Sequence, residues 1–256
     1  MRANRTFYLT QKTRLNLIYQ SKLQGGSMIL KERIEDIKKR IVTESQKAGR
    51  NSQDVTLLGV TKTKPVALIE EALESGIEFI GENKVQEASE KVPLLNGKFK
   101  EFHFIGHLQS NKINKLLSLN PILIHSIDKI STAIKLNDSL IRLDRMQDIL
   151  IQVNTSNEDS KFGINPDDVN NFVDSLKKLS QLNIIGLMTI GKLTDNKDEI
   201  RKCFKMLKDI FDDLKKEALP AIKHLSMGMS HDFEIAIQEG ATIIRVGSAI
   251  FGERNY

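Results

Sequence analysis

Eight short apolar segments of β-type composition, alternating with segments of helical periodicity, constrain the fold of this chain more than any other feature. The first begins at Val55 and the last ends at Val246, and no two of them are joined by a hairpin-type turn. Alternation of this kind predicts a parallel sheet, and eight such units close a barrel. The segments cover residues 55–61, 77–80, 102–105, 122–125, 149–153, 184–188, 222–225 and 241–246.

These segments predict a single α/β domain, a (β/α)8 TIM barrel, over residues 28–256. An open, doubly wound parallel sheet is the alternative fold. We favour the barrel because the units number eight and because no Gly-x-Gly-x-x-Gly phosphate motif follows the first segment. No linker or low-complexity tract interrupts residues 29–256, and an amphipathic helix that ends near Gly49 precedes the first segment.

The net charge of +5 is confined to residues 1–27 and therefore says nothing about the folded body. This leader contains five basic side chains and no acidic one. Subtracting them from the 38 basic residues of the chain leaves 33, which equals the number of acidic residues. A broad phosphate-binding face is not implied, and the lack of tryptophan leaves little material for an aromatic nucleic-acid platform. We expect no nucleic-acid partner. Nucleic-acid binding through the basic leader is a distant alternative.

The basic leader, residues 1–27, is expected to be poorly ordered and irrelevant to the chemistry. Its arginine content and lack of acidic residues resemble an organellar transit segment, but it is not enriched in serine. Gln24-Gly25-Gly26 precedes Met28, where helical periodicity begins, and codons for Gln-Gly-Gly can form a purine-rich ribosome-binding site. We favour the hypothesis that Met28 is the natural start and that the leader is not native; a transit peptide is the alternative.

The composition predicts an ordinary globular protein of the cytoplasm. Hydrophobic residues make up 40% of the chain and charged residues 28%. No run approaches the ~18 apolar residues that a membrane helix needs, so we expect no membrane association. The single cysteine, Cys203, excludes an internal disulfide and fits a reducing compartment.

Two lysines, Lys62 and Lys64, follow the first apolar segment, where a TIM barrel carries its chemistry. A lysine at this position can point over the barrel mouth, where partial burial lowers its pKa and makes it a nucleophile toward carbonyl groups. It can equally face solvent. Strand alternation puts Lys62 in register with Leu58 and Val60, but does not decide which face these residues occupy.

Glycine and serine residues follow the seventh and eighth segments, which is the usual phosphate site of this architecture. Gly228 lies in the loop 226–230 and permits close approach of the backbone, while Gly247 and Ser248 follow the eighth segment. Each motif alone is an ordinary turn, but together they favour a phosphate site. A carbonyl-binding lysine and a phosphate site suggest one ligand with an aldehyde and a phosphate, and pyridoxal 5′-phosphate (PLP) has both.

Several motifs occur in a fixed order along the chain, and together they resemble the pyridoxal phosphate homeostasis protein family. The resemblance runs from about residue 29 to Tyr256. It implies a PLP-binding barrel of fold type III, similar to the amino-terminal domain of alanine racemase. The motifs are Val60-Thr-Lys-Thr-Lys-Pro65, Phe79-Ile-Gly-Glu-Asn83, His103-Phe-Ile-Gly106 with Leu108-Gln-Ser-Asn-Lys112, Leu225-Ser-Met-Gly-Met-Ser230 and Arg245-Val-Gly-Ser-Ala-Ile-Phe-Gly252.

The resemblance also implies a role for each site residue. It selects Lys62 as the lysine that holds PLP as an aldimine (a Schiff base). It implies that Arg245 faces the pyridine nitrogen, where a guanidinium cannot give up a proton and the ring stays largely unprotonated. The cofactor-binding residues that it implies are Lys62, Asn83, Met188, Ser226, Gly228, Arg245, Gly247 and Ser248, of which Ser226, Gly228, Gly247 and Ser248 serve the phosphate.

Two further features of the site are expected on the same basis. Lys161 is a second amine near the mouth in the resemblance, and a solvated loop lysine is the alternative. His103 and His107 are not expected to bind a metal, because they lie in different local structures.

The function implied is that of a PLP-binding regulatory or carrier protein in vitamin B6 and amino-acid homeostasis. Alanine racemases add a carboxy-terminal β domain that supplies a tyrosine and completes a dimer, whereas this chain ends nine residues after Gly247. We therefore expect no robust catalysis, a monomer, and apo-forms of PLP enzymes as transient acceptors. A PLP-dependent amino-acid racemase and a cofactor-free class I aldolase are the alternatives.

Overall fold

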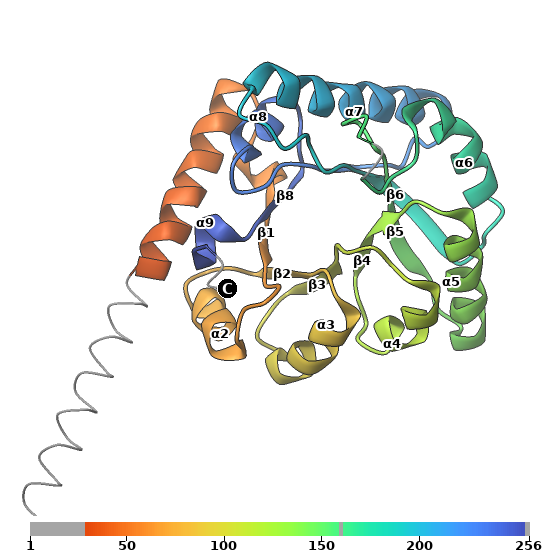
Figure 1. Ribbon diagram of the computed structural model, residues 1–256, viewed down its shortest axis with the longest axis horizontal. Coiled ribbons are helices and arrows are strands. Elements are labelled where there is room, and N and C mark those ends of the chain that lie inside the picture. Colours follow the sequence, from red (N-terminus) through yellow and green to blue (C-terminus); the bar gives the residue numbers. More distant parts are fainter. Residues whose placement is uncertain (1–28, 159–160, 254–256) are drawn as a thin grey trace, which may run out of the picture.

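The computed structural model describes residues 29–158 and 161–253, and the predicted leader lies outside them. Eight parallel strands form a closed barrel in sequential order, surrounded by helices (Figure 1). The strands are β1 (Thr56–Val60), β2 (Phe79–Glu82), β3 (Glu101–Phe104), β4 (Leu123–Ile127), β5 (Gln147–Gln152), β6 (Leu182–Met188), β7 (His224–Ser226) and β8 (Ile243–Val246).

Helices connect each strand to the next, and a helix over residues 29–47 precedes β1. Short 3₁₀ helices lie before β1, after α3 and before α4 and α6. The α-helices after β1 are α2 (Val66–Glu74), α3 (Val85–Lys91), α4 (Ile113–Leu117), α5 (Ile130–Leu143), α6 (Val169–Leu176), α7 (Lys197–Glu217), α8 (Phe233–Gln238) and α9 (Ser248–Phe251).

Closure of the sheet is made by β1, which pairs with β2 on one side and with β8 on the other. The β1–β8 register runs from Thr56 opposite Ile243 to Gly59 opposite Val246. The predicted TIM barrel is therefore confirmed, and the open, doubly wound sheet is wrong.

The predicted apolar segments overlap all eight strands but miss some of their ends. The second segment was expected from Ile77, whereas β2 begins at Phe79 because the Ile77 amide still bonds to the carbonyl of Ala72 after α2. Helix α9 was not predicted, and it begins directly after Gly247. Apolar composition identifies a strand but does not say where its ladder of hydrogen bonds starts.

Two hydrophobic cores stabilise the barrel. The larger lies between the strands and the surrounding helices, and includes Phe102 and Phe104 of β3. The smaller fills the barrel interior and consists of Leu58, Leu123, Leu150, Ile185, Met188 and Ile243. Each fully buried side chain of this size contributes about 1.5–3 kcal/mol relative to an exposed one. The interior core also identifies which strand residues point inward.

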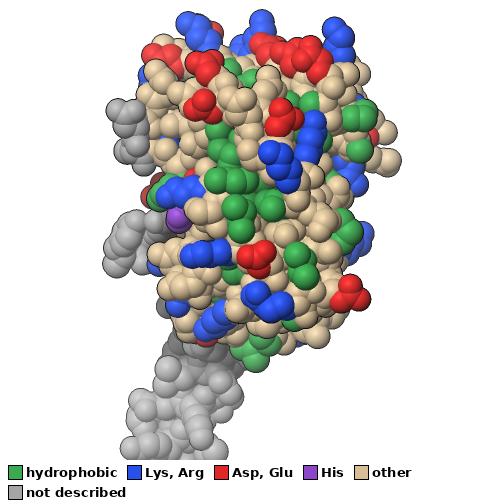
Figure 2. Space-filling model, turned by 90° about the vertical axis from the view of Figure 1, so that its right-hand side faces the viewer, with side chains coloured by type: hydrophobic (Ala, Val, Ile, Leu, Met, Phe, Trp, Pro, Cys, Tyr) green, Lys and Arg blue, Asp and Glu red, His purple; other side chains and the backbone are tan. Residues whose placement is uncertain are grey.

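The helical surface carries charges of both signs. On the face that presents α5 and α6, basic and acidic side chains are interspersed around a band of apolar ones (Figure 2). Exposed apolar residues of α5 include Ile130, Ile134 and Ile141. Within the described ranges, no helix has the length and apolar character that crossing a membrane requires.

Candidate functional site

A cavity of about 850 Å³ opens where the strands end, at the mouth of the barrel. A site for a small molecule commonly has a volume of ~300–1,000 Å³, and TIM barrels carry such sites at this end. Its wall is built from the ends of several strands and the loops that follow them. Residues from six strand ends contribute: Val60, Asn83, Ile105, Gln152, Met188 and Arg245.

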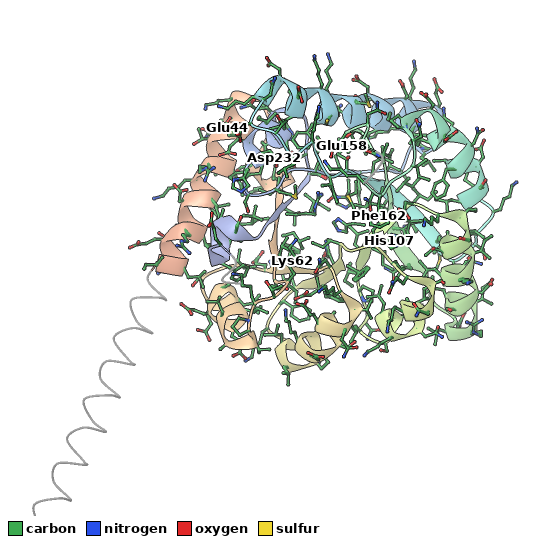
Figure 3. All side chains as sticks on the ribbon, in the orientation of Figure 1. Glu44, Lys62, His107, Glu158, Phe162 and Asp232 are labelled. Carbon is green, nitrogen blue, oxygen red and sulfur yellow. The ribbon has the colours of Figure 1, made fainter. Side chains whose placement is uncertain are left out.

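Lys62 lies in the wall of this cavity, near the middle of the barrel (Figure 3). Strand alternation explains its position, because Leu58 belongs to the interior core and Val60 to the cavity wall. Lys64 also lines the cavity, but its amine lies 3.4 Å from the carbonyl oxygen of Phe251 and 3.3 Å from that of Gly252. The Lys64 amine is thereby held at the end of α9.

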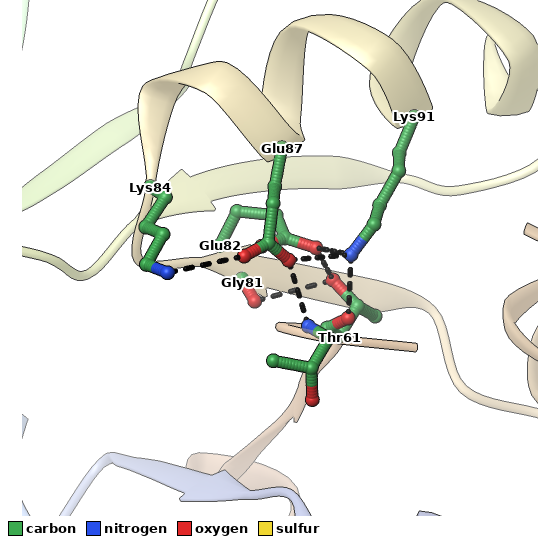
Figure 4. Close-up of polar contacts among 7 residues, drawn as sticks. Thr61, Gly81, Glu82, Lys84, Glu87 and Lys91 are labelled. Atoms are coloured by element: carbon green, nitrogen blue, oxygen red, sulfur yellow. Dashed lines mark hydrogen bonds and ion pairs between the residues drawn. The ribbon is translucent and has the colours of Figure 1, made fainter. Parts of the chain in front are cut away.

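The turn that carries Lys62 is anchored by a polar cluster (Figure 4). The Thr61 hydroxyl donates to buried Glu82 at 2.7 Å, and the Thr63 amide donates to Glu87 at 2.7 Å. Lys91 of α3 donates 3.0 Å hydrogen bonds to the Thr61 carbonyl oxygen and to both carboxylates. The backbone on each side of Lys62 is therefore fixed to β2 and α3.

Burial and charge oppose each other at Glu82, the centre of this cluster. Burial raises the pKa of its carboxyl group, while the Thr61 hydroxyl and the ammonium of Lys91 act in the opposite direction. The second carboxylate oxygen of Glu82 is buried and has no hydrogen-bond partner among the described residues. A buried carboxylate of this kind depends on its one cation.

Arg245 enters the cavity wall from β8 and is held in one direction. Its Nη1 donates to the Ser226 hydroxyl at 2.7 Å and its Nη2 to the Thr189 carbonyl oxygen at 2.8 Å. Burial lowers the pKa of Arg245 to about 10, against the opposing charge of Asp232. The guanidinium therefore keeps its proton at neutral pH.

Two of the residues predicted to serve the phosphate, Ser226 and Gly228, lie outside the cavity wall that the described residues form. Ser226 is fully buried beneath it and contacts Arg245 and His125. Gly228 has φ +90°, and a Cβ there would lie 2.5 Å from the Cβ of Ala236. Gly228 thus allows β7 to lead into α8, and the phosphate roles of Ser226 and Gly228 stay predictions.

Ser230, which the sequence did not single out, occupies the cavity wall beside Gly247 and Ser248. Its hydroxyl oxygen lies 3.2 Å from the backbone amides of Gly247 and Ala249. The signal was available, since Ser230 ends the same loop as Ser226. The loops after β7 and β8 are therefore joined at the cavity through Ser230.

Asn83 and Met188 both line the cavity, as expected. The Oδ1 atom of Asn83 is buried and has no hydrogen-bond partner within the described part of the chain. A Cβ on Gly106 would lie 1.9 Å from the Asn83 backbone oxygen, so the ends of β2 and β3 can approach only because residue 106 is glycine. This Oδ1 atom is an acceptor that a polar group of a ligand or a water could satisfy.

The rim of the cavity is formed in part by an aromatic pair, His107 and Phe162, whose rings stack with centroids 4.2 Å apart (Figure 3). The sequence had not predicted either residue as part of the site. Lys161 lies outside the cavity wall formed by the described residues; its amine bonds to Glu158 at 3.0 Å and to the Gly191 carbonyl oxygen at 2.9 Å. No group of three potential metal ligands occurs among the residues that the structure describes.

The donor set of the cavity fits PLP. Lys62 offers a primary amine for an aldehyde, and Arg245 a fixed cation for a ring nitrogen. Apolar side chains such as Val60 and Met188 suit a flat ring, and the hydroxyls of Ser230 and Ser248 suit an anion. The unsatisfied Asn83 amide suits a polar substituent.

The chain is similar in sequence to known proteins whose names refer to PLP. The family model described as alanine racemase, N-terminal domain, matches residues 34–255. A pyridoxal phosphate homeostasis protein from Aquifex aeolicus is 40% identical over 225 residues, which are 88% of this chain and 98% of that protein. This chain belongs to the pyridoxal phosphate homeostasis protein family. The Escherichia coli member of the family is 36% identical over 226 residues, covering 87% of this chain and 96% of the relative.

Several solved structures have a fold similar to that of this chain. PipY of Synechococcus elongatus, solved with PLP bound, has a TM-score of 0.75 and 32% identity, covering 87% of this chain and 100% of PipY. A Bifidobacterium adolescentis protein has a TM-score of 0.84 and 33% identity, covering 89% of this chain and 96% of that one. An alanine racemase of Clostridium difficile, with a TM-score of 0.65, is only 15% identical and shares the fold alone.

Proposed function

We propose that this member of the pyridoxal phosphate homeostasis protein family binds PLP at the barrel mouth through Lys62 and takes part in intracellular PLP, vitamin B6 and amino-acid homeostasis. The observation that carries the proposal is that Lys62, Arg245 and Ser248, from opposite ends of the sequence, line one cavity. The PLP-bound structure of PipY and the names of the family members support it. Family membership also favours this function over the racemase and aldolase alternatives.

Each part of the cavity has its own task in this proposal. PLP supplies an aldehyde that captures primary amines, and the Lys62 amine is the group that takes it up. The guanidinium of Arg245, fixed by Ser226 and Thr189, faces the ring nitrogen and keeps its own proton. Gly247 and Ser248 bind the phosphate, and Ser230 replaces Ser226 in this role because its hydroxyl is in the cavity wall.

The proposed cellular role follows from holding a reactive aldehyde in the cavity at the barrel mouth. We infer that the protein keeps PLP away from other amines and passes it to apo-forms of PLP enzymes as transient acceptors. The proposed setting is the cytoplasm and the proposed state is a monomer, in agreement with the expectations from the sequence.

An absorption spectrum with matched lysine variants tests the proposal. The wild-type protein, incubated with PLP, is expected to show the visible band of lysine-bound PLP, and Lys62→Ala is expected to abolish it. Lys64→Ala is the matched control, since Lys64 lines the same cavity with its amine held by α9. Reduction with borohydride and peptide mapping should place the label on residue 62. A band retained in Lys62→Ala would overturn the assignment.

A further inference from the structure

A continuous chain of hydrogen bonds crosses the barrel interior beneath the cavity. Its contacts join Glu101 to His103 at 2.8 Å, His103 to His125 at 3.0 Å, His125 to Ser226 at 2.9 Å and Ser226 to Arg245 at 2.7 Å. The two histidines come from β3 and β4, and the last two residues from β7 and β8. We refer to these five residues as the interior chain.

The interior chain connects the solvent at the start of β3 with the cavity wall. Glu101 is the first residue of β3, and 40% of its side chain is exposed. His103, His125 and Ser226 are buried, and Arg245 reaches the cavity. Polar groups therefore occupy a path through an interior that most TIM barrels fill with branched apolar side chains.

The chemistry of its two ends, together with neutral histidine rings, sets the direction of the interior chain. A guanidinium only donates hydrogen bonds, and a carboxylate only accepts them. Arg245 therefore donates to the Ser226 oxygen, and the Ser226 hydroxyl is free to donate to His125 Nδ1. With both rings neutral, His125 Nε2–H then donates to His103 Nδ1, and His103 Nε2–H donates to Glu101.

The surroundings of His125 favour a neutral ring there. Burial lowers the pKa of His125 well below its usual value, and the nearby Arg245 adds to the effect. The hydrogen bond from His103 lowers the pKa of Glu101, which keeps that carboxylate an acceptor. His103 faces Glu101, His125 and the ring of Phe79, while His224 of β7, whose pKa burial lowers to about 4, is neutral at pH 7.

We propose that His103, His125 and Ser226 are positioning residues that, with Glu101 as their anchor, fix the direction of the Arg245 guanidinium and thereby the environment of the cofactor's ring nitrogen. The inference rests on the proposed function, because it assigns Arg245 to that nitrogen. The proposal implies that Glu101, which is partly exposed at the opposite end of the barrel, affects the environment of the cofactor's ring nitrogen.

The first test needs no cofactor. Nitrogen-15 NMR of the histidine rings is expected to show the Nε2–H form for both His103 and His125 at pH 7. In Ser226→Ala, His125 loses the donor to its Nδ1 but still donates from Nε2–H to His103, so the ring should keep the Nε2–H form while its Nδ1 resonance moves toward that of an unbonded nitrogen. An Nδ1–H form of either ring in the wild-type protein would overturn the proposed direction.

The second test uses the protein loaded with PLP that is labelled with nitrogen-15 in the ring. Ser226→Ala and Glu101→Gln are expected to move the ring-nitrogen resonance, and Ser226→Ala to raise the Kd for PLP about tenfold, as expected for loss of a hydrogen bond to a charged group. Ser226→Thr, which keeps the hydroxyl, should restore the resonance. Glu78→Gln is the matched control, because Glu78 is half-exposed, precedes β2 and pairs with Lys100 outside the interior chain.

The outcomes separate this inference from the proposed function. If the wild-type protein shows no visible absorbance band of lysine-bound PLP, the proposed function fails. The nitrogen-15 measurement of the histidine rings still tests the interior chain in that case. If the band forms but the ring-nitrogen resonance is the same in wild type, Ser226→Ala and Glu101→Gln, the positioning role is wrong. Glu101→Gln keeps the test decisive should Ser226→Ala fail to fold, because Glu101 is partly exposed.

Discussion

The amine of Lys91 donates a 3.0 Å hydrogen bond to the carbonyl oxygen of Thr61, the residue directly before Lys62. The same amine binds the carboxylates of Glu82 and Glu87. A single side chain of α3 therefore balances the charge of a buried glutamate and holds the turn that presents Lys62. We therefore expect the stability of this cluster and the placement of the Lys62 turn to depend on Lys91.

Replacement of Lys91 by methionine tests this dependence. Lys91→Met leaves the buried Glu82 carboxylate without its cation and is expected to lower the free energy of unfolding by about 3 kcal/mol, measured by urea denaturation. Adding Glu82→Gln should recover part of the loss. Lys98→Met is the control, because the Lys98–Glu70 pair is exposed and should contribute about 0–1 kcal/mol. Equal losses in the two lysine variants would contradict the prediction.

Substitution of Ser230 tests the phosphate site. Ser230→Ala removes the hydroxyl that joins Gly247 and Ala249, and is expected to raise the Kd for PLP about tenfold. Pyridoxal, which has the aldehyde but no phosphate, should bind the variant and the wild type alike in the same absorbance titration. A matching loss of pyridoxal affinity would show that Ser230 shapes the whole cavity and does not serve the phosphate.

A pair of glycine substitutions measures how tightly the backbone at Gly228 packs against α8. Gly97, which also has a positive φ, serves as the comparison. Gly228→Ala places a Cβ 2.5 Å from that of Ala236 at φ +90°, so we expect a loss of about 2–4 kcal/mol in unfolding free energy. Gly97→Ala shares the backbone strain, at φ +79°, but its Cβ meets no atom within 4 Å, and it should cost only about 1 kcal/mol. The difference between the variants, from thermal or urea unfolding, isolates the steric contact.

Acid should destabilise the protein through His224. Burial, together with the charge of Lys223, lowers the pKa of His224 from 6.5 to about 4. Between these values the unfolded chain binds a proton that the folded one does not, so stability is complete above pH 6.5 and falls as the pH drops toward 4. The loss should be at most about 3 kcal/mol and less with solvent screening. His224→Gln should flatten the pH profile of the melting temperature, although His125 leaves a residual slope; an unchanged profile would contradict the assignment.

The barrel was predictable because its signal is local and repeated. Each strand is an apolar run followed by a helical pattern, and the inward position of Lys62 follows from alternation with Leu58 and Val60 once closure is known. The choice between Ser226 and Ser230 was not predictable in this way. β7 is only three residues long, and its last residue, Ser226, is still inside the barrel, so the cavity receives the serine four positions later.

The interior chain was beyond sequence reasoning for a different reason. His125 and Ser226 lie 101 positions apart, and only the closure of the sheet brings them within hydrogen-bond distance. Such contacts leave no periodic pattern along the chain. His103, Ser226 and Arg245 were visible as parts of motifs, but Glu101 and His125, which complete the interior chain, were not.

Closure of the sheet by β1 and β8 also has a consequence for biosynthesis. The amine that would capture the aldehyde is translated near the beginning of the barrel, whereas Arg245, Gly247 and Ser248 belong to its last strand or directly follow it. A nascent polypeptide therefore has no complete binding site until its final strand docks against its first. Capture of the ligand therefore has to wait until β8 has been made, and a product that stops before β8 would carry the lysine without Arg245, Gly247 and Ser248.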